Sequence, residues 1–242
     1  MAGMAHREAG VTLRVVTYNV HKCRGVDRRI APERIAEVLH EVDPDIAALQ
    51  EVTQPQAELI ARELALGVVM GENRKHLGHG YGNAVLSRFP IRANRNYDLS
   101  VTGREARGCL RADVEWGPRG LHLFNVHLGT SFVERRHQGR RLIAEELLRD
   151  MTLEWPRIVL GDFNEWSTGL ATRLLRSHLK SADIRLHLRR TRTYPGILPF
   201  LHLDHIYYDP QLRLERLTML RSRKALLASD HLPLAAEFVI GD

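Results

Sequence analysis

Short apolar segments that end directly on a polar residue recur along this chain, and they constrain its fold more than any other feature. The clearest is RIVLGDFNEWSTG, residues 157–169, in which residues 158–160 form a β-branched and apolar run. Such a run is typical of a buried strand, and Asp162 and Asn164 follow it at once. Because residues two apart on extended backbone point to the same side, we expect this carboxylate and this amide to project together. Alone, the same residues would equally suit a turn.

The rest of the chain alternates strand and helix patterns, which predicts an α/β protein. We expect strands at 13–19, 45–51, 68–70, 82–88, 109–116, 121–127, 157–160, 204–209 and 234–240. Apolar residues at helical spacing predict helices at 32–42, 55–65, 134–151 and 169–179, with Gly139 interrupting the third. Residues 185–200 read as a basic loop.

Two parts of the chain share one layout of strand, helix and strand. Asn19 and Glu51 end the strands of the first unit, and His127 and Asp162 end those of the second. Two such units packed face to face would bring four polar strand ends to one rim. No low-complexity linker divides the chain, so we expect a short flexible leader, 1–12, and a single domain, 13–242.

The composition is basic and indicates anionic partners. Lys and Arg total 35 against 29 Asp and Glu in 242 residues, which gives a net charge of +6 and a pI near 9.7. This balance suits phosphate esters, nucleic acid or an acidic membrane surface, and does not choose among them.

Cysteine usage and the first residues predict a cytoplasmic protein. Cys23 and Cys109 form no C-x-x-C pair, so we expect free thiols in a reducing compartment rather than a zinc ribbon or a disulfide framework. Residues 1–14 lack the apolar core of a secretory signal, and no run approaches the roughly 20 apolar residues of a membrane span. We expect a cytoplasmic monomer with no stable insertion into membranes.

Sites in sheet proteins tend to lie outside strand ends, and the polar residues there form a series. In chain order, the segments TYNVHK, ALQEV, GNAVLSRFP, NVHLG, VLGDFN, LDHIYY and SDHLPL resemble the motifs of the endonuclease/exonuclease/phosphatase superfamily. That group includes deoxyribonuclease I-like nucleases, sphingomyelinases and inositol-polyphosphate 5-phosphatases. The match runs from Asn19 to Pro233, so it covers nearly the whole chain.

The resemblance implies a four-layer α/β/β/α sandwich of two mixed β-sheets flanked by helices. It also implies hydrolysis of phosphoesters that depends on Mg²⁺, with Mn²⁺ able to substitute. Magnesium prefers hard oxygen ligands, which the side chains of Asn19, Glu51 and Asp230 provide.

The same resemblance assigns the remaining roles. His231 is the candidate general base, because imidazole titrates near neutrality, and Asp204 would fix its tautomer. His127 and Asn164 would donate hydrogen bonds to phosphoryl oxygens. Asp162 is left open between orienting water and holding a second metal ion. Asn83 and Arg107 are the candidate phosphate contacts.

Several alternatives stay open. A phosphodiesterase or phosphatase is the first expectation, a DNA or RNA nuclease the second, and a non-catalytic module binding nucleic acid or membrane the third. His76 and His79 have the spacing of a metal pair but lie among glycines, which suggests a mobile loop. Residues 185–192 and 213–224 are basic, either as a contact surface or as a solvated face. The segment at Tyr194 would lie near the substrate or simply pack.

Overall fold

The structure is a computed structural model, and it describes residues 12–117, 120–141, 150, 153–165, 168–182, 193–194 and 201–240. The predicted leader therefore lies outside the described residues except for Thr12. The predicted basic loop 185–200 also lies outside them, except for residues 193–194.

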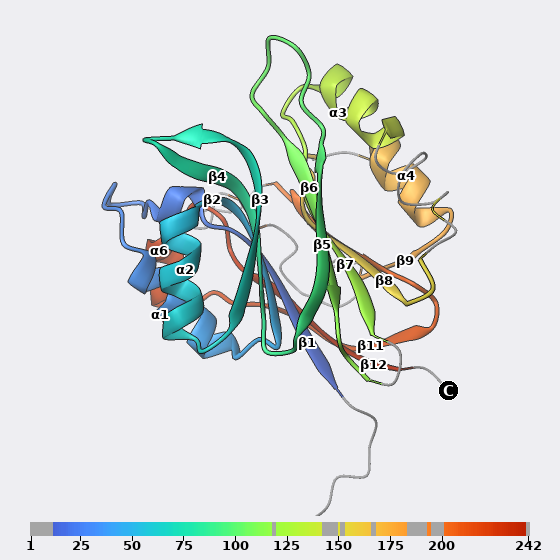
Figure 1. Cartoon of the computed structure of the whole chain (residues 1–242), viewed down its shortest axis with the longest axis horizontal. Helices are drawn as coiled ribbons and strands as arrows, with labels where there is room; N and C mark the ends of the chain where they lie inside the picture. The colour runs from blue at the N-terminus through green and yellow to red at the C-terminus, as the bar shows by residue number, and fades with distance from the viewer. Residues whose placement is uncertain are drawn as a thin grey trace, which may run out of the picture.

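The described strands form two mixed six-stranded sheets (Figure 1). The first sheet contains, in spatial order, β11 (Leu212–Met219), β12 (Leu234–Ile240), β1 (Leu13–Asn19), β2 (Ile46–Thr53), β4 (His79–Ser87) and β3 (Gly67–His76). The second contains β5 (Ile91–Asp98), β6 (Gly108–Val114), β7 (Leu121–His127), β8 (Arg157–Asp162), β10 (Asp204–Tyr208) and β9 (Lys180–Ser181).

Helices cover the outer face of each sheet (Figure 1). The first sheet carries α1 (Pro32–Val42), α2 (Gln54–Glu63) and α6 (Arg223–Ala228), and the second carries α3 (Phe132–Gly139) and α4 (Leu170–Arg176). The predicted four-layer α/β/β/α sandwich is thus confirmed. None of the described helices is long and apolar enough to cross a membrane.

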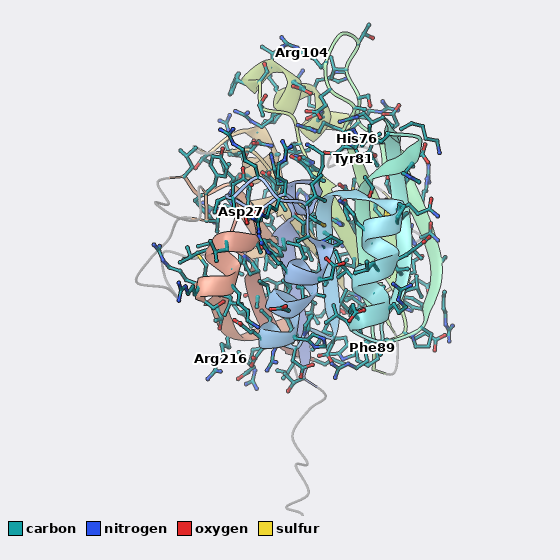
Figure 2. All side chains as sticks on the ribbon, turned by 90° about the vertical axis from the view of Figure 1, so that its left-hand side faces the viewer. Asp27, His76, Tyr81, Phe89, Arg104 and Arg216 are labelled. Carbon is teal, nitrogen blue, oxygen red and sulfur yellow. The ribbon has the colours of Figure 1, made fainter. Side chains whose placement is uncertain are left out.

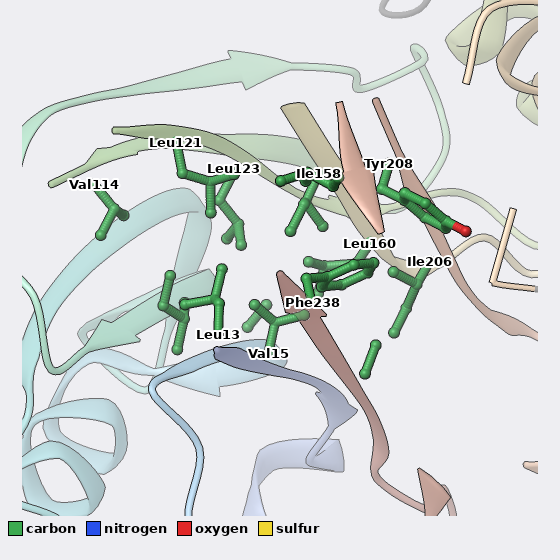
Figure 3. Close-up of a cluster of buried hydrophobic side chains, with 14 of the residues drawn as sticks. Leu13, Val15, Val114, Leu121, Leu123, Ile158, Leu160, Ile206, Tyr208 and Phe238 are labelled. Atoms are coloured by element: carbon green, nitrogen blue, oxygen red, sulfur yellow. The ribbon is translucent and has the colours of Figure 1, made fainter. Parts of the chain in front are cut away.

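The sheets pack through the side chains that alternate toward their shared interface. On β1, Leu13 and Val15 belong to the cluster between the sheets, whereas Val16 and Tyr18 face the helices. Figure 3 shows the interface cluster, in which Phe238 of the first sheet lies among residues of the second. Because both faces of the central strands are buried, their apolar runs are nearly continuous, which is why the sequence identified them.

The two predicted strand–helix–strand units occupy equivalent places. Strand β1 pairs in parallel with β2, and β7 pairs in parallel with β8. A hairpin lies beside the first strand of each unit, β11–β12 in one sheet and β5–β6 in the other. The ends of all four strands consequently meet at one edge of the interface.

Several elements differ from the prediction, among them β9 and α6, which were not expected. Strands β5 and β11 were not expected, and both are polar strands at sheet edges. Helix α3 covers Phe132–Gly139, and residues 142–149 of the predicted helix lie outside the described part. Cys23 and Cys109 are free and buried, as predicted.

Candidate active site

A pocket of about 300 Å³ opens where the strand ends of the two sheets meet. Most of the predicted site residues line it, although they come from segments far apart in the sequence. The lining residues are Asn19, His21, Glu51, Arg107, Thr130, Asp162, Asn164, Tyr194, Leu201, Leu203, Asp230 and His231.

Glu51 reaches this pocket because its strand contains a bulge. The pairing of β2 with β4 shifts register between Leu49 and Val52, and Glu51 has a φ of +55°. Regular alternation would have sent Glu51 to the helix-covered face together with Ala47 and Leu49, which lie there. A β-bulge re-aims a side chain in this way.

The carboxylate of Glu51 is surrounded by donors and cations. Tyr81 donates its hydroxyl to Oε2 at 3.1 Å, and Nζ of Lys22 lies 3.4 Å from the same oxygen. Burial alone would raise the pKa of Glu51, but His127, Lys22 and His21 outweigh it and lower the pKa to about 2. Glu51 is therefore ionised at neutral pH.

Asn19 and Asn164 hold the carboxylate of Asp162 from two sides. Nδ2 of Asn19 donates to Oδ2 of Asp162 at 3.0 Å, and the backbone N–H of Asn164 donates to Oδ1 at 2.8 Å. The side chain of Asn164 donates to the carbonyl of Leu128 at 3.0 Å. Asp162 and Asn164 thus form a hydrogen-bonded turn, and both also line the pocket. Burial raises the pKa of Asp162.

His231 and Asp204 form the predicted pair. Nδ1 of His231 lies 3.1 Å from Oδ2 of Asp204, which leaves Nε2 facing Asp162 at 3.7 Å. Burial would lower the pKa of His231, but the charges of Asp204, Asp162 and Asp230 outweigh it and raise the pKa to about 10.

Arg107 lines the pocket, and His127 lies beside two of the carboxylates that line it. Nε2 of His127 lies 3.9 Å from Glu51 Oε1 and 3.8 Å from Asp162 Oδ2. Burial, together with the charge of Arg107, lowers the pKa of His127 to about 3. Arg107 is 5% exposed, its Nη2 is 3.0 Å from Glu105, and its Nε has no hydrogen-bond partner among the described residues.

The structure does not place Asn83 at the pocket. Asn83 is fully buried, and its Nδ2 donates to the backbone carbonyls of Gly108 and Asn125 in the opposite sheet, at 3.1 and 3.0 Å. Asn83 was predicted to contact phosphate, but its side chain instead forms hydrogen bonds between the two sheets. Asn125 bonds in the opposite direction: from the second sheet, its Nδ2 donates to the backbone carbonyls of Leu49 and Ala84 in the first, at 2.9 and 2.8 Å.

Sequence reasoning missed His21, Lys22 and Tyr81. Nδ1 of His21 lies 3.8 Å from Glu51 Oε2 and 3.7 Å from Asp230 Oδ2. His21 and Lys22 follow Asn19 in TYNVHK, so their place in the motif was the available signal. Their orientation depends on a left-handed turn that no local pattern indicated.

The other residues considered in the sequence, Tyr194, His76 and His79, lie in different places. Tyr194 lies against His231, with ring centroids 4.8 Å apart, and lines the pocket. His76 and His79 pair across the β3–β4 turn, and His76 packs on Tyr81 at 5.6 Å. Figure 2 shows His76 and Tyr81 at the same end of the molecule as Arg104.

The donors at the rim suit a divalent cation. Three carboxylates, those of Glu51, Asp162 and Asp230, line the pocket, and carboxylates are hard ligands for Mg²⁺ and Mn²⁺. The fourth, Asp204, is buried against His231. Among the described residues, no three His, Cys, Asp or Glu side chains already surround a common point. Asn19 is committed elsewhere, because its Oδ1 accepts the His21 N–H at 3.0 Å while its Nδ2 faces Asp162 and Glu51.

Similar proteins share this architecture. YbhP of Escherichia coli K12, an uncharacterized protein, is 31% identical over 245 residues, which span 93% of this chain and 96% of YbhP. The mannosyl-6-phosphatase Bt3783 of Bacteroides thetaiotaomicron superposes with a TM-score of 0.78 at 20% identity, over 94% of this chain and 100% of that one. D. rerio TDP2 complexed with a single-strand DNA product superposes with a TM-score of 0.74 at 17% identity, over 94% and 98%.

The family model for the Endonuclease/Exonuclease/phosphatase family matches residues 16–231, a range that includes every residue lining the pocket. The chain belongs to the endonuclease/exonuclease/phosphatase family.

Proposed function

We propose that this protein hydrolyses phosphoester bonds with the help of a divalent metal ion, as a phosphodiesterase or phosphatase. One observation carries the proposal. His231, with its Nδ1 3.1 Å from Asp204, lines a pocket that Glu51 and Asp162 also line, and Nε2 of His127 lies within 4 Å of both of these carboxylates. A base, a cation-binding carboxylate and hydrogen-bond donors are the groups that this reaction needs.

In its neutral form, His231 takes a proton from the attacking water through Nε2, and Asp204 fixes the ring and stabilises the imidazolium that results. Asp162, 3.7 Å from this nitrogen, orients the water. Its two hydrogen bonds from Asn19 and Asn164 keep its carboxylate pointing into the pocket.

His127 and Arg107 bind the phosphoryl group. The lowered pKa of His127 keeps its ring neutral, so it donates one hydrogen bond without adding charge. Arg107 supplies a fixed cation, and Asn164 contributes the amide hydrogen that Leu128 does not use. These donors are in place before charge develops on the phosphoryl oxygens, which favours the transition state.

Mg²⁺, or Mn²⁺ in its place, would be held by Glu51 and Asp230 with Asn19 beside them, and when bound it neutralises phosphoryl and leaving-group oxygens. The cytoplasmic location and the monomeric state expected from the sequence are part of the same proposal.

A DNA or RNA nuclease is the second candidate. The net charge of +6 suits a polyanion, and a TDP2 bound to single-strand DNA shares the fold. The mannosyl-6-phosphatase with the same fold supports the first candidate instead.

One set of assays tests the proposal. The purified protein is incubated with p-nitrophenyl phosphate, bis-p-nitrophenyl phosphate, plasmid DNA and phospholipid vesicles, each with Mg²⁺, Mn²⁺ or EDTA. We expect metal-dependent turnover of a small ester, with His231→Gln and Glu51→Gln each reducing the rate on the order of 10²–10⁴-fold. Turnover in EDTA, or full activity in either variant, would refute it.

The same assays separate the alternatives. Nicking of plasmid DNA without turnover of either nitrophenyl ester would favour the nuclease. Tight binding of DNA or vesicles with no hydrolysis of any ester would favour the non-catalytic module.

A further inference from the structure

The turn that follows β1 has an unusual backbone. His21, Lys22 and Cys23 have φ values of +45°, +58° and +54°, so three successive residues with side chains occupy the left-handed region. Residues with a Cβ atom are strained in this region, because the Cβ lies too close to the following carbonyl oxygen. Strain of this kind persists where surrounding structure enforces it, and it is concentrated at functional sites.

The surrounding contacts enforce this turn. Oδ1 of Asn19 accepts the His21 N–H at 3.0 Å, and Nε2 of Gln56 donates to the Lys22 carbonyl at 2.8 Å. Cys23 is buried against the helices of the first sheet. The turn is therefore held at both its start and its end, and the direction of the His21 side chain follows from it.

The imidazole of His21 lies between two carboxylates. Its Nδ1 is 3.8 Å from Oε2 of Glu51 and 3.7 Å from Oδ2 of Asp230, with 38% of its side chain exposed toward the pocket. Donor atoms of an octahedral ion with 2.1 Å bonds lie roughly 3.0 Å apart when adjacent and roughly 4.2 Å apart when opposite. The separations of His21 Nδ1 from the two carboxylates, 3.8 and 3.7 Å, fall between these values.

Asn19, in contrast, presents its amide nitrogen to this place. Its Nδ2 faces Glu51 Oε1 at 3.4 Å, and its Oδ1 is bonded to the turn itself. Asn19 thus positions its neighbours, whereas Nδ1 of His21 lies within 4 Å of both carboxylates.

We propose that His21 is a direct ligand of the divalent ion, together with Glu51 and Asp230, and that it makes the site prefer Mn²⁺ over Mg²⁺. Imidazole nitrogen is a better ligand for first-row transition ions than for Mg²⁺, which favours oxygen. This inference rests on the proposed function, because it concerns the ion which that function requires.

The test uses the full-length protein loaded with less than one equivalent of Mn²⁺. Pulsed electron paramagnetic resonance detects a nitrogen bonded to Mn²⁺ through its ¹⁴N modulation. We expect modulation in the natural protein, its loss in His21→Asn, and its retention in His127→Gln, which removes the other imidazole near Glu51. Asparagine tolerates the left-handed backbone, so this variant preserves the turn; circular dichroism and thermal unfolding check its fold.

Affinity provides a second readout. Removing ligand-sphere groups costs roughly 10–100-fold in metal affinity, so we expect Mn²⁺ to bind His21→Asn at least tenfold more weakly, with a change below threefold for Mg²⁺. His21→Asp, which restores a charged oxygen donor, should bind Mg²⁺ at least as tightly as the natural protein.

The experiments distinguish a failure of the proposed His21 ligand from a failure of the proposed function. Mn²⁺ that binds in a Glu51-dependent manner without ¹⁴N modulation, or with modulation that survives in His21→Asn, overturns the role of His21 and leaves the proposed function intact. Hydrolysis in EDTA, with no Glu51-dependent Mn²⁺ binding, overturns the proposed function itself.

Discussion

His231 and Asp204 meet across the two sheets, with Nδ1 of His231 3.1 Å from Oδ2 of Asp204 and side-chain exposures of 6% and 0%. Asp204 begins β10 of the second sheet, whereas His231 precedes β12 of the first. The reactive nitrogen is therefore aimed by a contact that exists only when both sheets are packed together.

Asp204→Asn should lower kcat by about 10²–10³-fold and move the acidic limb of the pH–rate profile to lower pH. A general base must be neutral to act, and Asp204 is the strongest of the charges that raise the pKa of His231. Removing that charge lowers the pKa, so His231 loses its proton at a lower pH. Profiles of kcat/KM with bis-p-nitrophenyl phosphate and saturating Mn²⁺ measure the shift.

The control is Asp27→Asn, an exposed carboxylate paired with Arg34. Its profile should match that of the natural protein. An acidic limb that stays in place or moves upward in Asp204→Asn contradicts the assignment of His231 as the base.

Acid should destabilise the fold partly through His127. Its pKa is lowered to about 3 from an ordinary value of 6.5, so its stabilising contribution is complete above pH 6.5 and is lost as pH falls toward 3. Between pH 7 and pH 4, the unfolding free energy of both proteins should fall. We expect the fall in His127→Gln to be about 2–3 kcal/mol smaller than in the natural protein. Urea unfolding in EDTA, followed by circular dichroism, measures this difference.

His137→Gln on α3 is the matched control, because His137 is exposed. It should lose as much stability on acidification as the natural protein does. An equal loss in His127→Gln would show that the buried ring is protonated in the fold.

Arg107→Ala should lower kcat/KM on the order of 10²-fold, because a fixed cation facing the phosphoryl group is removed. Arg107→Lys should recover only part of the activity, since an ammonium lacks the planar fork of a guanidinium. Arg104 lies in the same loop but is exposed, so the kcat/KM of Arg104→Ala should stay within threefold of that of the natural protein. Steady-state kinetics at fixed ionic strength compare the three, and equal losses at Arg104 and Arg107 would indicate a general charge effect.

Asn125→Leu should lower the unfolding free energy by about 2–4 kcal/mol, because it leaves the buried carbonyls of Leu49 and Ala84 without donors. It also removes one of the three acceptors of Gln50, whose Nε2 lies 2.7 Å from Asn125 Oδ1. Urea unfolding measures the loss. Asn94→Leu, on the exposed edge strand β5, should change it by less than about 0.5 kcal/mol, and equal effects would rule out the network.

The central strands and their polar ends could be predicted because burial on both faces imposes apolar runs on the sequence. Strands β5 and β11 were not predicted because they are edge strands in which exposed polar and charged residues interrupt the apolar pattern. Such a strand forms because its backbone hydrogen-bonds to a neighbouring strand. The sequence of the segment alone does not show which strand that neighbour is.

The site was predictable as a set of residue types but not in its orientations. Glu51 enters the pocket through a bulge, and His21 enters through a left-handed turn. Asn83 has the same chemistry as Asn164 but is turned into the interface between the sheets. Each of these outcomes depends on contacts with segments distant in the sequence.

The equivalent strand orders of the two sheets make the chain suited to circular permutation. Leu13 pairs with Phe238, so the outer ends of β1 and β12 lie side by side. A chain that began at β11 and joined β12 to β1 would complete the first sheet before entering the second. Asn19, Glu51 and His231 would then belong to one contiguous half, and His127, Asp162 and Asp204 to the other. Neither half would contain an oriented base, so hydrolysis by two co-expressed halves would report directly on their assembly.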